Sequence, residues 1–185
     1  MVQKYIQTVL SELGTVLKDV NAEDSGRAVK MICSAPRIFL AGVGRSGYMM
    51  RAFAMRLMHA GLSAYMVGDT ETPSAAAGDL LVLGSGSGET ESLIAVARKS
   101  KKLGLHLLVV TGFPASPLGS LAEQTVQISA PTPKSSSQNG FVSAQPMGSL
   151  FEQALLLYLD AVVMEVMDQK GLDEKIMFGR HANLE

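Results

Sequence analysis

Short apolar runs alternate with longer amphipathic stretches through the middle of the chain. The apolar runs are typical of strands that are buried on both faces, as in a parallel sheet. The stretches between them carry apolar residues at helical spacing. This alternation predicts an α/β fold with a parallel sheet. The predicted strands are residues 37–41, 63–67, 79–83, 105–111 and 125–128.

Helices are predicted before, between and after these strands. The first carries an apolar stripe from Ile6 to Val20, and the second covers residues 22–34 and ends before Pro36. Two leading helices are more than a parallel sheet needs for cover, so we expect them to pack on another subunit. The other predicted helices end near His59 or cover residues 91–103, 118–122, 146–169 and 173–178.

The length of 185 residues predicts one domain with a substantial core. Two helices occupy residues 1–35, the α/β core residues 36–130, and the last helix and tail residues 146–185. Residues 131–145 are polar and rich in breakers, which predicts a loop. Long loops of this kind either serve as binding loops or remain in solvent, and the sequence leaves both readings open.

Composition narrows the function classes. Hydrophobic residues make up 47% and charged residues 18%, which is typical of a globular protein. A net charge of −1 without a basic cluster argues against nucleic acid as a partner. The single cysteine, Cys33, excludes an internal disulfide and fits a core position. No signal peptide or membrane span is evident, so we expect a cytoplasmic protein that does not bind membranes.

The third predicted strand leads into a turn of alternating glycine and serine, residues 84–90 (GSGSGET). Glycines there allow positive φ and a close approach to a ligand, and Thr90 is placed to cap the following helix. The amides at a helix start carry partial positive charge, so they favour an anion. Hydroxyl donors beside them suit a phosphate group. A turn that only caps its own helix is the alternative.

A second glycine-rich turn, residues 42–47 (GVGRSG), follows the first strand and precedes a helix. It matches the dinucleotide fingerprint G-x-G-x-x-G in its expected context. The acidic residue of that fingerprint should follow by ~20 positions, whereas Asp69 comes later in the chain. The chain is also too short for a second catalytic domain, and Ser46 adds a hydroxyl beside the helix start. Two hydroxyl-bearing turns around one anion favour a phosphorylated small molecule over NAD.

Glu152 is the carboxylate that the pattern favours for chemistry. It lies in the first turns of the helix predicted over residues 146–169, with apolar residues on nearly every side. A carboxylate is costly to bury unless it is paired or functional, and a proton-transferring base suits such a setting. A half-exposed glutamate favoured by the helix dipole is the alternative. His181, in the polar tail, is the other candidate, and no metal-ligand spacing is present.

With these residues assembled, the chain resembles the sugar isomerase (SIS) family, and more narrowly the 6-phospho-3-hexuloisomerases of the ribulose monophosphate pathway. The resemblance spans essentially the whole chain apart from the loop from Thr132 to Ser143. The Gly-Ser turn marks the broad family, whereas QPMGSLFEQ and the ending HANLE indicate the subgroup. The residues that carry the resemblance are 41–47, 53–59, 84–90, 145–153 and 181–185.

The resemblance implies a three-layer αβα sandwich with a five-stranded parallel sheet, flavodoxin-like or Rossmann-like, and a homotetramer built as a dimer of dimers. It implies interconversion of D-arabino-hex-3-ulose 6-phosphate and D-fructose 6-phosphate through an enediolate, without metal, nucleotide or other cofactor. Glu152 then shuttles the proton between C2 and C3, and His181 assists at the sugar oxygens, either within its own subunit or in a neighbouring one. By position, the phosphate is held by Ser46, Ser85, Ser87 and Thr90. Weaker candidates for binding the substrate are Gly44, Arg45, Gly86, Gly88 and Glu89.

Two other functions stay open at this point. One is another phosphosugar isomerase, of the arabinose-5-phosphate or sedoheptulose-7-phosphate type, which the broad turn motif does not separate. The other is a sensor domain that binds a phosphosugar without catalysis, as SIS domains in transcription regulators do. Such regulators usually carry a DNA-binding domain, and the first helices here are not basic. The presence of Glu152 and His181 favours an enzyme.

Overall fold

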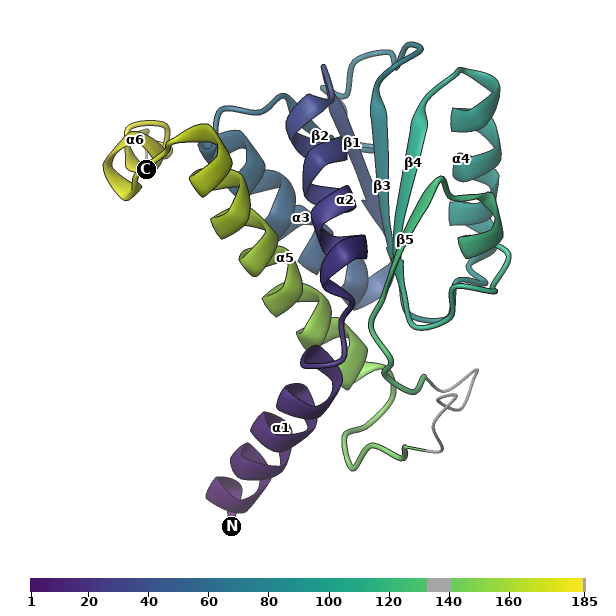
Figure 1. Ribbon diagram of the computed structural model, residues 1–185, viewed down its shortest axis with the longest axis vertical. Helices are drawn as coiled ribbons and strands as arrows, with labels where there is room; N and C mark the ends of the chain where they lie inside the picture. Colours follow the sequence, from purple (N-terminus) through teal and green to yellow (C-terminus); the bar gives the residue numbers. More distant parts are fainter. Residues whose placement is uncertain (133–140, 185) are drawn as a thin grey trace.

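A parallel five-stranded sheet runs through the centre of the computed structural model, which describes residues 1–132 and 141–184. Helices cover both faces of the sheet, so the predicted α/β sandwich is confirmed (Figure 1). The elements are α1 (Val2–Leu17), α2 (Ala22–Ser34), β1 (Ile38–Gly42), α3 (Gly44–His59), β2 (Ala64–Met66), β3 (Leu80–Ser85), α4 (Glu91–Lys102), β4 (His106–Thr111), the 3-10 turn η1 (Gly119–Leu121), β5 (Gln124–Gln127), α5 (Ser149–Lys170) and α6 (Glu174–Phe178).

Successive side chains along the strands point alternately into two separate hydrophobic cores. Ile38 and Leu40 of β1 point to the side covered by α2, α3 and α5. Phe39 and Ala41 point to the opposite side, where α4 packs. All six residues of β3 are buried, as expected for a central parallel strand that is covered on both faces.

The strand β3 is longer than its apolar run indicated. Gly84 and Ser85 continue the strand because they pair with Val110 and Thr111 of β4. The sequence pattern could not show this pairing, since small and polar residues carry no strand signal. The extension places the Gly-Ser turn directly at the carboxyl edge of the sheet.

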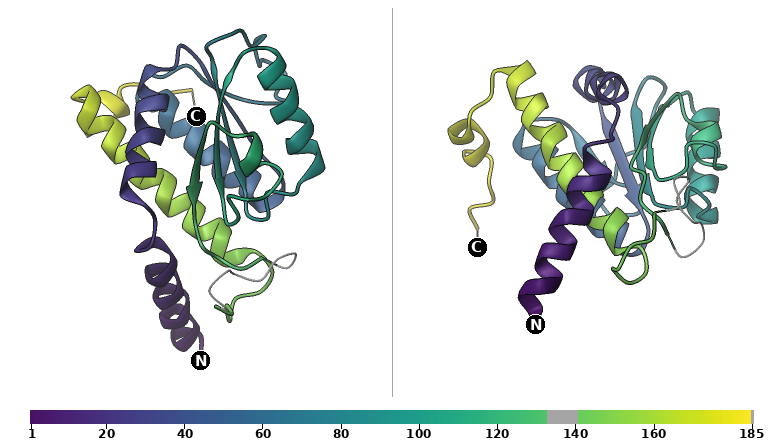
Figure 2. Two further views of the ribbon diagram at one scale, coloured as in Figure 1. Left: turned by 45° about the vertical axis from the view of Figure 1, so that its right-hand side comes forward. Right: turned by 60° about the horizontal axis from the view of Figure 1, so that its bottom comes forward.

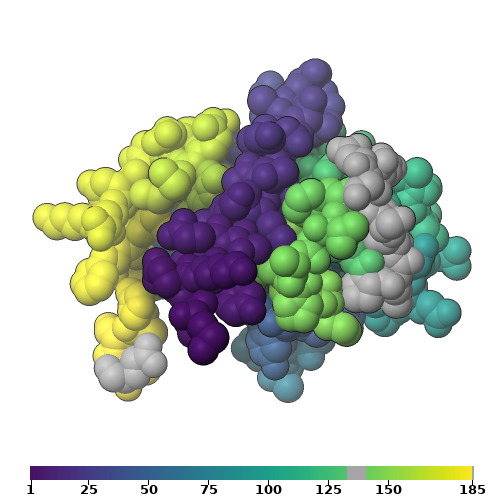
Figure 3. Space-filling view, turned by 90° about the horizontal axis from the view of Figure 1, so that it is seen from below, coloured from purple at the N-terminus to yellow at the C-terminus, as the bar shows by residue number. Residues whose placement is uncertain are grey.

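The two leading helices both contact the rest of their own chain, and the expectation that they also pack on another subunit stays a prediction. α2 covers β5 and contacts α5, while α1 contacts α5 through its second half, including Leu13 and Val16. The first half of α1 projects from the body (Figure 2). Seen from below, α1 lies beside the green segment that precedes α5 (Figure 3).

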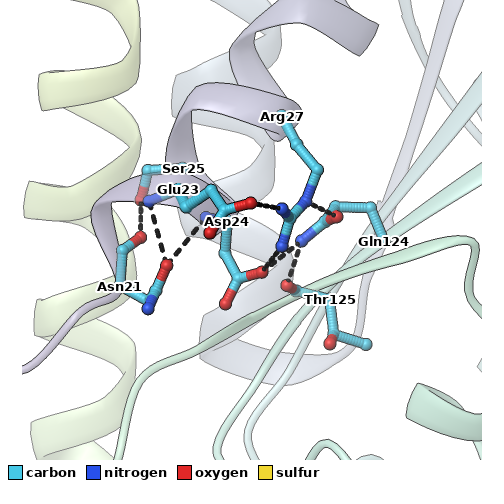
Figure 4. A network of polar contacts seen from close by, with 7 residues as sticks. All are labelled: Asn21, Glu23, Asp24, Ser25, Arg27, Gln124 and Thr125. Atoms are coloured by element: carbon cyan, nitrogen blue, oxygen red, sulfur yellow. Dashed lines mark hydrogen bonds and ion pairs between the residues drawn. The ribbon is translucent and has the colours of Figure 1, made fainter.

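Polar contacts fix α2 against the edge strand β5 (Figure 4). Asn21 caps the helix, because its Oδ1 accepts hydrogen bonds from the amides of Glu23 and Asp24 at 2.9 Å each. Arg27 Nε donates to Gln124 Oε1 at 2.8 Å, and Gln124 Nε2 donates to Asp24 Oδ1 at 2.9 Å. The cap explains why the helix begins at Ala22, as predicted.

The strand order is β2-β1-β3-β4-β5. After β1 the chain forms β2 on one side of β1 and then crosses back to form β3 on its other side. The direction in which strands are added therefore reverses between β1 and β3. Ligands of open α/β sheets bind at the carboxyl edge near such a switch point. No helix in the described part of the chain is long and apolar enough to cross a membrane.

Candidate active site

The two glycine-rich turns begin side by side at the switch point. Gly42, at the end of β1, pairs with Gly84 of β3 in the sheet register. The first turn leads into α3 and carries Ser46 in the first turn of that helix. The second leads into α4 and carries Ser87 and Thr90. The fold therefore brings together two turns that are about 40 residues apart in sequence.

The glycines act mainly by allowing close packing. Gly88 has the predicted positive φ of 66°, whereas Gly84 and Gly86 do not, so the expectation for those two is wrong. A Cβ at Gly84 would lie 2.7 Å from Met50 Sδ, and one at Gly86 would lie 3.0 Å from Thr132 Cγ2. A larger residue at Gly84 would therefore displace the buried Met50 side chain, and one at Gly86 would press on Thr132 and Phe151. In the first turn, a Cβ at Gly47 would lie 2.7 Å from the carbonyl oxygen of Gly42.

A cavity of about 290 Å³ opens between the two turns and the start of α5. We call it the carboxyl-edge cavity. Its walls combine hydroxyl groups, glycine backbone and one carboxylate, and apolar surface comes from Met147 and Phe151. The lining residues are Ser46, Gly86, Ser87, Thr90, Thr132, Met147, Gly148, Phe151 and Glu152.

Three of the four predicted phosphate-binding hydroxyls, those of Ser46, Ser87 and Thr90, belong to residues that line this cavity. Thr90 is the N-cap residue of α4, but its side chain makes no capping hydrogen bond, so the predicted side-chain cap is wrong. Its hydroxyl is therefore not committed to the helix amides.

Ser85 lies one layer deeper than the other hydroxyls. It is 4% exposed and does not line the cavity. Its Oγ accepts a hydrogen bond from the amide of Gly88 at 3.2 Å and lies 3.4 Å from Thr90 Oγ1. In the described structure, Ser85 supports the turn and touches the residue that faces the cavity.

Glu152 lies in the first turn of α5 and faces the hydroxyls across the cavity. Its side chain is 17% exposed, and Oε2 lies 2.7 Å from Nε of Arg45. The contact is an ion pair without the alignment of a hydrogen bond. The Arg45 side chain is 58% exposed and is not among the residues that line the cavity, which it borders through Glu152. The carboxylate is thus largely buried and paired, which fits the base that we expect. It also lies at a helix start, which fits the alternative of a glutamate favoured by the helix dipole.

The weaker predicted contacts divide into two groups. Gly86 lines the cavity and Gly88 shapes the turn behind it. Gly44 has a φ of 61° at the start of α3, where it turns the chain into the helix. Glu89 is exposed, does not line the cavity and donates its amide to Ser87 Oγ at 3.3 Å.

His181 is not brought to this cavity within one chain. Its ring stacks on that of His59 with centroids 5.3 Å apart, beside a second cavity of about 390 Å³. This tail cavity is lined on α5 by Asp160, Val163, Met164 and Met167. These residues follow Glu152 by about 12–22 Å along the helix, at ~1.5 Å rise per residue. Burial, and then the nearby Arg56 and His181, lower the pKa of the His59 imidazole.

Sequence reasoning missed several cavity residues. Thr132 follows β5, and its Oγ1 is buried without a hydrogen-bond partner among the described residues. Met147 is the one non-glycine residue with positive φ (58°) in the described chain. Only the breakers around Met147, namely Pro146 and Gly148, signalled an unusual backbone. The rest of the loop, residues 133–140, lies outside the described residues.

Two observations concern the dinucleotide and metal sites that the sequence analysis considered. Asp69, the candidate ribose ligand of a dinucleotide site, is held by two hydrogen bonds from Arg51, at 2.7 and 2.9 Å. These bonds lower the pKa of its carboxyl group. Within residues 1–132 and 141–184, no three His, Cys, Asp or Glu side chains are arranged to hold a metal ion.

Comparisons with known proteins show which family the sequence matches. The SIS domain family matches residues 31–157. A 3-hexulose-6-phosphate isomerase of Bacillus subtilis (strain 168) is 45% identical over 182 residues, covering 98% of this chain and 98% of that protein. A 3-hexulose-6-phosphate isomerase of Methylomonas aminofaciens is 38% identical, covering 98% of this chain and 99% of that protein.

A solved structure extends the comparison to three dimensions. The crystal structure of a Methanococcus jannaschii protein, for which a function of 3-hexulose-6-phosphate isomerase was inferred, superposes with a TM-score of 0.85. The two sequences are 36% identical, and the match covers 98% of this chain and 99% of that one. The likeness therefore includes the N-terminal helices and the C-terminal tail as well as the sheet.

Proposed function

The chain belongs to the SIS domain family, and we propose that it is a 6-phospho-3-hexuloisomerase, the activity also named 3-hexulose-6-phosphate isomerase. It interconverts D-arabino-hex-3-ulose 6-phosphate and D-fructose 6-phosphate. Support comes from several relatives of that name at 38–45% identity over nearly their full length.

One observation in the structure carries the proposal. The carboxyl-edge cavity combines hydroxyl donors at a helix start with a single carboxylate on the facing wall. A phosphosugar needs an anion site at one end and a base at its reacting carbons. The hydroxyls of Ser46, Ser87 and Thr90 supply the first, and Glu152 supplies the second.

The phosphate group anchors the substrate. The start of α4 favours negative charge, and the three cavity hydroxyls donate hydrogen bonds to the phosphate oxygens. Ser85 holds Thr90 and the Gly88 amide in place from beneath. Fixing the phosphate brings C2 and C3 against the base, which lowers the entropic part of the barrier.

Glu152 transfers the proton. In the forward direction its carboxylate removes the proton from C2 of the 3-ulose, and the electrons move to the C3 carbonyl oxygen to form an enediolate. A proton also passes from O2 to O3, and the return of the carbon-bound proton to C3 then leaves a hydroxyl at C3 and the carbonyl at C2, which is fructose 6-phosphate. Arg45 orients the carboxylate through their ion pair, and its other N–H donors stabilise the enediolate oxygen more than the ketone.

The protein functions as a homotetramer built as a dimer of dimers, in which His181 assists at the sugar oxygens of a neighbouring site. Two observations support this part of the proposal. Within one chain, His181 lies beside the tail cavity and away from the carboxyl-edge cavity. The projecting half of α1 also presents exposed apolar residues, among them Tyr5 at 67% and Ile6 at 44% exposure.

The test is an activity assay on a panel of phosphosugars with the purified protein. We expect turnover of fructose 6-phosphate and its 3-ulose isomer, and little turnover of arabinose 5-phosphate or sedoheptulose 7-phosphate. Glu152→Gln should lower kcat by ~10²–10⁴-fold, the typical contribution of a general base. Glu165→Gln, on the exposed side of the same helix, is the matched control and should keep wild-type kcat. Preference for another phosphosugar, or normal turnover by Glu152→Gln, would contradict the proposal.

A further inference from the structure

A buried carboxylate outside the carboxyl-edge cavity holds the segment that leads into it. Glu12, on α1, is 8% exposed. Its Oε1 accepts a hydrogen bond from the amide of Ala144 at 2.7 Å. Its Oε2 accepts from Ser143 Oγ at 2.7 Å and from Gln145 Nε2 at 3.0 Å. One side chain thus ties three consecutive residues to a helix that is more than 100 residues away in sequence.

These hydrogen bonds are strong enough to offset the burial of the charge. Burial raises the pKa of Glu12. The hydrogen bonds from the Ala144 amide and from the side chains of Ser143 and Gln145 together lower it by more than burial raises it, so the net pKa is below the usual value. Charge-assisted hydrogen bonds are roughly twice as strong as neutral ones. The carboxylate form is therefore the one that holds the segment.

The segment held by Glu12 continues directly into the cavity wall. Met147, two residues after Gln145, has a φ of 58° and lines the cavity. A non-glycine residue persists in this strained region only where the surrounding structure fixes it. Glu12 is placed to provide that restraint, since α1 and the segment before α5 lie side by side (Figure 3).

The next residue in the segment touches the base itself. A Cβ at Gly148 would lie 3.4 Å from Glu152 Oε1, so the Gly148 backbone borders the carboxylate directly. Gly148 also accepts the first hydrogen bond of α5, from the Glu152 amide at 3.0 Å. A shift of residues 143–148 therefore changes the position of the Glu152 carboxylate.

We propose that Glu12 is a positioning residue of the isomerase, which holds residues 143–148 so that Glu152 keeps the geometry that proton transfer requires. The inference rests on the proposed function, because it assigns Glu152 the role of base. It gives α1 a task within its own chain. The phosphate site lies on the other wall of the cavity, so Glu12 acts on kcat and leaves substrate binding almost unchanged.

The test begins with Glu12→Gln, which keeps the shape and removes the charge. The amide oxygen can still accept from Ala144, but the NH2 group then faces Ser143 Oγ and Gln145 Nε2, which must turn to offer an acceptor, and every bond that remains has lost its charge assistance. We expect kcat to fall about 10–100-fold, since a misplacement of ~1 Å can cost 10²-fold, while KM stays near its wild-type value. The double variant Glu12→Gln/Gln145→Glu exchanges donor and acceptor, and it should recover most of the lost kcat.

Leu13→Ala is the matched control for a loss of stability. Leu13 is the next residue on α1, buried at 7% exposure in the hydrophobic core, and its apolar side chain cannot form a hydrogen bond to the held segment. We expect it to lower the melting temperature at least as much as Glu12→Gln while kcat stays near wild type. If both variants lose kcat in proportion to stability, or if the double variant recovers nothing, Glu12 has only a structural role and the proposal fails.

Hydrogen–deuterium exchange separates this inference from the proposed function, because it needs no turnover. In Glu12→Gln the amides of residues 144–152 should exchange faster than in wild type, and those of β3 should not change. If the wild-type protein lacks isomerase activity, the proposed function fails, and its extension to catalysis falls with it. Unchanged exchange at residues 144–152 in an active protein overturns the positioning role alone.

Discussion

Gly44 and Gly88 share a backbone conformation but have different surroundings, which allows the structure to be tested quantitatively. Their φ values are 61° and 66°. A Cβ at Gly44 would have no atom within 4 Å, whereas a Cβ at Gly88 would lie 1.9 Å from Ser116 Oγ and 2.6 Å from Ser116 Cβ. An alanine at either site has the same backbone strain, and only the second also has a clash.

The expected magnitudes follow from these two terms. A left-handed conformation costs an alanine roughly 1–2 kcal/mol. At ~2–4 °C per kcal/mol for a chain of this size, Gly44→Ala should lower Tm by about 2–8 °C. Gly88→Ala adds an overpacking cost of about 1–3 kcal/mol or more. It should therefore be destabilised more than Gly44→Ala, and KM should rise because Ser87 and Thr90 are displaced.

A double-mutant cycle with Ser116→Gly isolates the clash. The substitution removes both close atoms, so Gly88→Ala/Ser116→Gly should be more stable than the sum of the single effects, by about 1–3 kcal/mol. Urea unfolding and calorimetry give the free energies. Equal effects of Gly44→Ala and Gly88→Ala, or an additive cycle, would refute the packing described at this turn.

Two further predictions concern the phosphate site and the tail cavity. Ser87→Ala should raise KM about 10–100-fold with a smaller change in kcat, because a hydrogen bond to a charged group contributes ~1.5–3 kcal/mol to binding; an unchanged KM in steady-state assays would contradict the phosphate role. The pKa of His59 is lowered from its usual 6.5 by burial and then by Arg56 and His181. The stabilisation that comes from keeping His59 neutral is therefore fully present above about pH 6.5. It declines as the pH falls through that value towards the folded-state pKa. Wild type should lose more unfolding free energy than His59→Gln between about pH 7.5 and 5.5, and parallel pH profiles would contradict this.

The elements of the fold could be predicted where local signals agreed. The Pro36 stop marks the end of α2, and the apolar runs mark the strands, because these signals lie within a few residues of the element. The extent of β3 could not be predicted, since Gly84 and Ser85 become strand only by pairing with β4. That extension also buries Ser85 and leaves Ser87 facing the cavity.

The candidate site shows the same division. Ser46, Ser87, Thr90 and Glu152 could be identified because glycine turns and an isolated carboxylate are visible in the sequence. The role of Glu12 could not, because its partners lie more than 100 residues away and form only in the fold. The link from Glu12 to the cavity depends on three-dimensional contact alone.

The central claim is that Glu152 moves a proton at the carbon next to the sugar carbonyl. The most direct measurement is deuterium incorporation into fructose 6-phosphate in D2O, followed by NMR or mass spectrometry, together with binding measured by calorimetry. Wild type should exchange the proton at C3, and Glu152→Gln should bind the sugar with similar affinity but exchange it at least ~10²-fold more slowly. Exchange by Glu152→Gln at the wild-type rate would contradict the account.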